Sequence, residues 1–194
     1  LYATQGSSYM KQVSNIILVI IILITSLNMI DFPWEFRFVD VKNNYLFVMV
    51  LAVLLPLSAF LWSLFRDSKS SKVVGIIFSV CLAAPCYIVF IFSYSDYDDI
   101  KRKGIDYSFE EINRLQANDN SYVLYRTNGG ATTSFGLVLR LEKETGFGLN
   151  VVKVIYSKYK ASESTLELTS DNQIKMQIQP YDKHGKVDVI LLSR

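Results

Sequence analysis

The chain has 194 residues, of which 51% are hydrophobic, and its formal net charge is +2. Such a small charge is not typical of a protein that binds nucleic acid through its phosphates, so no nucleic-acid partner is predicted. The mean hydropathy of +0.24 hides a strong asymmetry, because the excess of apolar residues lies before Ser95. The remainder has the composition of a small soluble domain.

The first residues of the chain resemble the remnant of an expression tag. Gln5-Gly6-Ser7 is similar to part of a protease site, and Met10-Lys11 reads as a natural start. We therefore expect residues 1–9 to lie outside the fold.

Three apolar stretches without Asp, Glu, Lys or Arg follow, at residues 13–30, 45–65 and 73–95. Each has about 18 to 23 residues, and a helix that rises about 1.5 Å per residue would cross a hydrocarbon core of roughly 30 Å at that length. The sequence predicts three transmembrane helices within residues 10–95, with membrane lipid as a partner. Because no ionisable side chain lies in these stretches, a transporter or pump acting alone is not expected.

Positive charges in short loops predict how the helices are oriented. Segment 66–72 contains Arg66, Lys69 and Lys72, so it is predicted to face the cytoplasm. The N-terminus would then be cytoplasmic, and residues 96–194 would be periplasmic or external to a bacterial cytoplasmic membrane. The basic run Lys101–Lys103 argues for the opposite orientation.

The connection between the first two apolar stretches is unusually aromatic. Phe32, Trp34 and Phe36 occur there within five residues. One interpretation is an interfacial segment, with rings in the headgroup layer and charges in water. The other is a contact surface for a second membrane protein. On the second interpretation, these three aromatic residues are candidate partner-binding residues.

Residues 96–194 are predicted to form a small α+β domain that is mainly antiparallel β. Ser108-Phe109-Glu110-Glu111 has the form of a capping box, which predicts a short helix as far as Gln116. Beyond Ser121 the apolar residues alternate with a period of two, which is typical of half-buried strands. An antiparallel meander, a curved sheet and a small sandwich all fit this pattern. The expected strands cover residues 122–127, 132–141, 149–159, 166–168, 174–178 and 187–191.

Asn128-Gly129-Gly130 is expected to form a tight hairpin turn, since Asn and Gly tolerate a positive φ. The run Gly129–Phe135 resembles a segment of uncharacterised bacterial membrane-anchored proteins with a small β domain. The resemblance implies that architecture and brings no catalytic residue with it. A plain turn and a binding loop both fit. The candidate partner-binding residues of this segment are Asn128, Gly129, Gly130, Thr132, Thr133 and Phe135.

The residue pattern does not point to catalysis. His184, the single histidine, lies in a polar loop, and no triad or metal signature accompanies it. Cys81 and Cys86 lie five residues apart on an expected helix, so their side chains point in different directions and no disulfide is expected. Gly146-x-Gly148 precedes a strand, whereas a nucleotide-binding fingerprint precedes a helix. We predict no enzyme activity, and no catalytic residue, metal or cofactor.

A few uncharged spans with a small outward-facing domain resemble the layout of polytopic toxin-immunity proteins. This resemblance implies a binding protein that neutralises a membrane- or periplasm-acting toxin. The alternative is an accessory or assembly subunit of a larger membrane complex, which would use residues 32–39 and the surfaces of the spans. A small-ligand sensor is a third hypothesis. In the first two hypotheses the partner is a protein.

Overall fold

The structure is a computed structural model that describes residues 2–194 except 31, 33, 118–119, 129–133, 170, 172, 183–185 and 193–194. The chain divides into two compact units. The first contains Leu1–Phe32 and Lys42–Asp98, and the second contains Pro33–Val41 and Asp99–Arg194. A short piece of chain between two helices of the first unit therefore belongs to the second unit.

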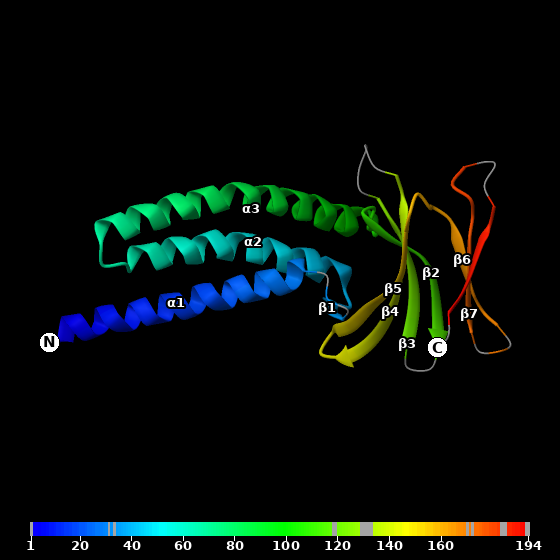
Figure 1. The fold of residues 1–194 in the computed structure, drawn as a ribbon, viewed down its shortest axis with the longest axis horizontal. Helices are drawn as coiled ribbons and strands as arrows, with labels where there is room; N and C mark the ends of the chain where they lie inside the picture. The colour runs from blue at the N-terminus through cyan, green and yellow to red at the C-terminus, as the bar shows by residue number, and fades with distance from the viewer. Residues whose placement is uncertain are drawn as a thin grey trace. The chain divides into compact units, whose positions relative to one another are not determined.

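The first unit consists of three long helices that run side by side, α1 (Tyr2–Met29), α2 (Val41–Leu64) and α3 (Lys69–Lys103) (Figure 1). Each is long and apolar enough to cross a membrane, and only 6%, 28% and 11% of the residues in their apolar windows are buried. Outward-facing Ile, Val, Leu and Phe side chains in such numbers are typical of a lipid-facing surface. The three predicted helices are present, and the structure supports a membrane protein.

The helices are longer than the predicted spans. Helix α1 begins at Tyr2, so residues 2–9, which we expected outside the fold, continue this helix. Helix α3 extends past Ser95 to Lys103. Lys103 and Asp99 form an ion pair one helical turn apart, with 2.8 Å between Nζ and Oδ1, which favours the added turns.

Polar contacts connect α1 to α2 near the end of α2. The amide oxygen of Asn15 accepts a hydrogen bond from Trp62 Nε1 at 2.8 Å and one from Arg66 Nη2 at 3.1 Å. Lys11 pairs with Asp67. An interhelical hydrogen bond of this kind contributes about 1 kcal/mol in a membrane. These contacts hold the two helices together at the end opposite to the α1–α2 connection.

The second unit contains two antiparallel sheets (Figure 1). The larger has five strands in the order β1-β5-β4-β3-β2, and the smaller has three in the order β6-β7-β8. The strands are β1 (Glu35–Phe38), β2 (Phe109–Ala117), β3 (Asn120–Thr127), β4 (Gly136–Gly146), β5 (Leu149–Tyr159), β6 (Ser164–Leu168), β7 (Ile174–Ile178) and β8 (Asp188–Leu192). The mainly antiparallel β domain is confirmed.

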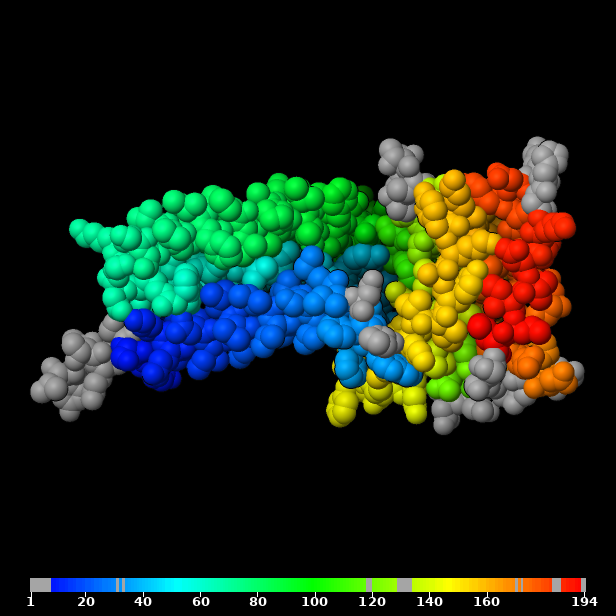
Figure 2. All heavy atoms as spheres, in the orientation of Figure 1, coloured from blue at the N-terminus to red at the C-terminus, as the bar shows by residue number. Residues whose placement is uncertain are grey.

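The hydrophobic core lies between the two sheets. The fully buried residues Leu124, Leu137 and Leu139 of the larger sheet form one cluster with Ile174 and Met176 of the smaller sheet. In Figure 2 the red β8 lies against the gold β5, and Lys158 of β5 pairs with Asp188 of β8. The domain is a small sandwich, one of the three architectures that the alternation predicts.

The helix predicted from the capping box is wrong, because residues 109–117 form strand β2. A register shift between Glu111 and Asn113 places Ile112 in a bulge. The bulge allows Ile112 and Leu115, three residues apart, both to pack against the core. A spacing of three is also the helical signature, so the bulged strand mimics a helix in the sequence.

The aromatic connection between α1 and α2 is β1, an edge strand of the larger sheet. Phe38 pairs with Leu149 of β5, and the Val39 N–H donates to the Gly148 carbonyl at 2.9 Å. The sequence predicted an interfacial or contact segment here and no strand. The larger sheet therefore combines one strand from between α1 and α2 with four strands that follow α3.

Candidate functional site

The predicted aromatic residues near β1 are exposed. Phe36 has 72% of its surface exposed and Trp34 has 51%, and Phe32 is exposed as well. The Lys153 ammonium lies 5.1 Å from the centre of the Trp34 ring, a cation–π contact that orients the indole. These rings are therefore available for contact with lipid or protein.

The second predicted group, in segment 128–135, is described only at its ends. The Asn128 N–H donates to the Ser108 carbonyl at 3.1 Å, which connects this segment to the start of β2. Phe135 is exposed, and the Arg126 guanidinium lies 5.5 Å from its ring centre. The candidates Gly129, Gly130, Thr132 and Thr133 lie outside the described residues.

The structure does not bring the described members of the two predicted groups together. Phe36 pairs with Val151 near the start of β5, whereas Gly136, which follows Phe135, pairs with Tyr159 at its end. Eight residues of a strand that rises about 3.3 Å per residue separate the two positions by roughly 26 Å. One small ligand cannot contact both Phe36 and Phe135, so these described members of the two groups lie on separate surfaces.

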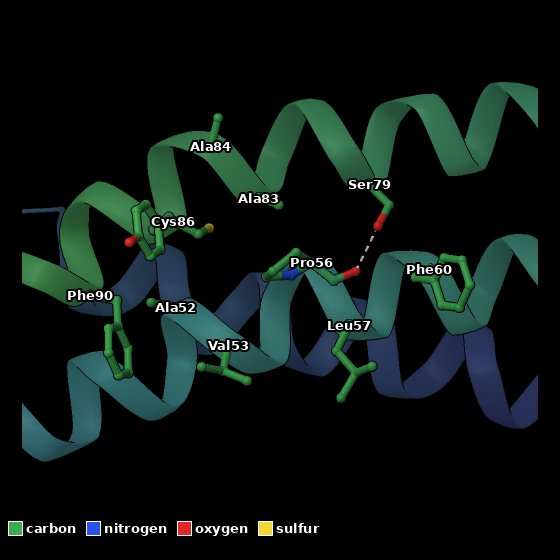
Figure 3. Close-up of a pocket in the computed structure, with 11 residues that line it drawn as sticks. Ala52, Val53, Pro56, Leu57, Phe60, Ser79, Ala83, Ala84, Cys86 and Phe90 are labelled. Atoms are coloured by element: carbon green, nitrogen blue, oxygen red, sulfur yellow. Dashed lines mark hydrogen bonds between the residues drawn. The ribbon is translucent and has the colours of Figure 1, made fainter.

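A groove that the sequence analysis missed lies between α2 and α3. It has a volume of about 760 Å³ and is open along its outer side (Figure 3). Its lining is almost entirely apolar: small side chains and a proline lie between aromatic rings. The lining residues are Ala52, Val53, Pro56, Leu57, Phe60, Ser79, Ala83, Ala84, Cys86, Tyr87 and Phe90.

Pro56 makes the backbone of this groove unusual. Proline has no N–H, so the Ala52 carbonyl cannot receive its normal hydrogen bond from four residues further along α2. The Pro56 carbonyl itself accepts a hydrogen bond from the Ser79 hydroxyl of α3 at 3.0 Å (Figure 3). This bond holds the two helices together beside the groove. The Ala52 carbonyl is thus an acceptor without its helical donor.

One sequence signal could have revealed the groove. Ser79, Ala83 and Cys86 are spaced by four and three residues, which places three small side chains on one face of a helix. Small residues at this spacing are typical of close helix packing in membranes. The sequence analysis treated each apolar stretch as a whole, and so did not group these residues into one face.

The larger sheet carries a buried polar network of a structural kind. The Tyr125 hydroxyl donates to Glu142 Oε1 at 2.7 Å, and Arg114 Nη2 lies 3.9 Å from Glu142 Oε2. Burial and the Glu142 carboxylate raise the pKa of Tyr125 well above its usual value. The Arg140 guanidinium stacks over Phe109 at 4.1 Å from the ring centre. The Tyr125 phenol therefore keeps its proton, which it donates in the hydrogen bond to Glu142.

Among the residues that the structure describes, no group of three or more His, Cys, Asp or Glu side chains is arranged to hold a metal ion. No protein-family model, curated protein or solved structure matches this chain. The functional argument therefore depends on the groove and on the two exposed aromatic surfaces.

Proposed function

We propose that this protein is a membrane-anchored binding protein that receives a transmembrane helix of a partner protein in the groove between α2 and α3. The observation that carries the proposal is the groove itself, because small side chains beside Pro56 leave the α2 backbone open to close approach. Helix association in lipid depends on such close contacts, since lipid tails are as apolar as the helices themselves.

A partner helix fits this groove better than a lipid tail. An acyl chain fills apolar space, but it has no hydrogen-bond donor. A partner helix with a Ser or Thr can donate its hydroxyl to the Ala52 carbonyl, the acceptor that Pro56 deprives of its helical donor. The small residues Ala52 and Ala83 also allow a helix backbone to approach closely, which an acyl chain does not need.

Photo-crosslinking in the native membrane tests this proposal. A benzophenone amino acid in place of Phe90 lies in the groove, whereas the same group at Phe92 is exposed on α3 outside the groove lining. We expect a protein adduct from position 90, none from position 92, and loss of the adduct when Ala83→Phe fills the groove. Lipid adducts alone at position 90, or equal protein adducts at both positions, would refute the proposal.

The specific form that we propose is an immunity protein of the bacterial cytoplasmic membrane, with α2 and α3 engaging a membrane-acting toxin and residues 96–194 in the periplasm. The absence of ionisable residues from the three predicted spans supports a binding role over a transport role. Expression of the intact chain should then protect cells from the cognate toxin, and Ala83→Phe should remove the protection. Cells that die equally with and without the chain would contradict this form.

The groove also favours the alternative, an accessory or assembly subunit of a larger membrane complex. A groove shaped for one helix suits a permanent neighbour as well as a toxin. In that case the adduct from position 90 would be found in growing, unchallenged cells at constant stoichiometry. An adduct that forms only after exposure to a toxin would favour the immunity form.

A further inference from the structure

The turn between β4 and β5 exposes an aromatic ring completely. Phe147 has an exposed fraction of 103%, and its φ of 54° lies in the left-handed region that bulky side chains rarely adopt. It is flanked by Gly146 and Gly148, whose φ values of 84° and 71° are also left-handed. A glycine would adopt the conformation of Phe147 at lower cost, so the fold alone does not account for an aromatic residue here.

This turn is connected to the start of a membrane-crossing helix. The Gly148 carbonyl accepts the hydrogen bond of the Val39 N–H, and helix α2 begins two residues later at Val41. Two residues of extended chain span about 7 Å at most. Tyr45, where the charge-free stretch of α2 begins, lies a further four residues along, or about 6 Å of helix.

Both lengths are comparable to the headgroup layer, which is about 5 to 8 Å thick on each side of the hydrocarbon core. The chain connections thus limit the distance between the β4–β5 turn and the headgroups. Exposed Phe36 of the neighbouring edge strand, and exposed Trp34 just before that strand, lie within the same short connection between α1 and α2. Trp and Tyr are enriched at this depth of a membrane, and Phe is among the residues that interfacial segments bury at the headgroup–acyl boundary.

We infer that the β4–β5 turn is a membrane-contact site, in which the ring of Phe147 inserts into the lipid headgroup layer and steadies the β domain against the membrane surface. The ligand is the lipid interface itself. Basic and acidic residues alternate nearby, as in Lys143 and Glu144, so the contact depends on the ring and not on anionic lipid.

Nitroxide depth measurement on the full chain in vesicles of phosphatidylethanolamine and phosphatidylglycerol tests this inference. Cys81 and Cys86 are first replaced by Ala, and the label is attached to F147C or, as the matched control, to L168C on β6, which is also exposed. Because Phe147 makes no buried contact, its replacement leaves the core intact.

We expect the label at position 147 to be relaxed more by oxygen than by a water-soluble nickel complex, and the label at position 168 to show the reverse. The difference should persist in vesicles of phosphatidylcholine alone. Two labels that are both relaxed more by oxygen, or both relaxed more by the nickel complex, would overturn the inference. A difference that disappears without anionic lipid would overturn it as well, because an electrostatic contact would then replace the aromatic one.

Discussion

A close contact between α2 and α3 allows a sharp test of the helix packing. At Gly75 of α3, an added Cβ would lie 2.5 Å from the Ser63 Cβ and 3.3 Å from the Ser63 Cα. Carbon atoms do not approach to 2.5 Å, so Gly75→Ala must move the helices apart. Overpacking of this kind costs about 1 to 3 kcal/mol, and we expect about 2 kcal/mol because Ser63 is fully buried and has no room to yield.

The stability is measured by SDS titration in mixed micelles, with the fluorescence of the two tryptophans as the signal, of which Trp62 borders this contact. The matched control is the double variant Gly75→Ala/Ser63→Gly, which removes the atom that clashes. Ser63→Gly alone also loses the hydroxyl bond to the Phe60 carbonyl at 2.7 Å, a modest cost. We expect the double variant to regain more than half of the stability that Gly75→Ala loses. Such a recovery is a favourable coupling between the two sites.

Two results would refute this reasoning. If Gly75→Ala leaves the unfolding transition unchanged, α2 and α3 do not approach as closely as the structure has them. If the free energies of the two single variants simply add in the double variant, Ser63 is not the side chain that limits the space at Gly75.

Further predictions concern buried hydrogen bonds in each unit. Tyr125→Phe should cost about 1 to 3 kcal/mol, because the nearly buried Glu142 carboxylate loses a donor. The folded state raises the pKa of Tyr125 above the usual value of about 10, so its contribution to stability is complete below that pH and falls as the pH rises further. Alkaline unfolding monitored by tyrosine absorbance should show this slope in the parent chain and a smaller one in Tyr125→Phe. Ser79→Ala, which removes the bond to Pro56 on the other helix, should cost about 1 kcal/mol in SDS titration, whereas Ser58→Ala, which loses only a bond within its own helix, should cost less.

The sequence predicts elements well where one local period dominates. Strand β5 has the predicted bounds, Leu149–Tyr159, and β7 has the predicted alternation of buried Ile174, Met176 and Ile178. The apolar stretches likewise predict three helices. Strand β4 was placed too early: it begins at Gly136 and continues to Gly146, because its polar end still pairs with β5.

The remaining errors come from contacts between distant parts of the chain. Strand β1 pairs with residues more than 110 positions later, and no local pattern encodes that partner. A bulge at Ile112 changes the local spacing of the core-facing residues in β2 from two to three. Residues of both α2 and α3 line the groove, so neither Pro56 nor Ala83 predicts it alone. The two predicted binding segments were expected from composition, and only the pairing of β5 shows that Phe36 and Phe135 are far apart.

The central claim is that three helices cross the membrane, with the β domain on one side and the α2–α3 turn on the other. Single cysteines at Ser68 in that turn and at Leu168 in β6, both exposed, test it directly on a background without Cys81 and Cys86. A membrane-impermeant maleimide applied to sealed vesicles of one orientation should label one position, and the other only after the vesicles are opened. Labelling of both positions from the same side would contradict the account.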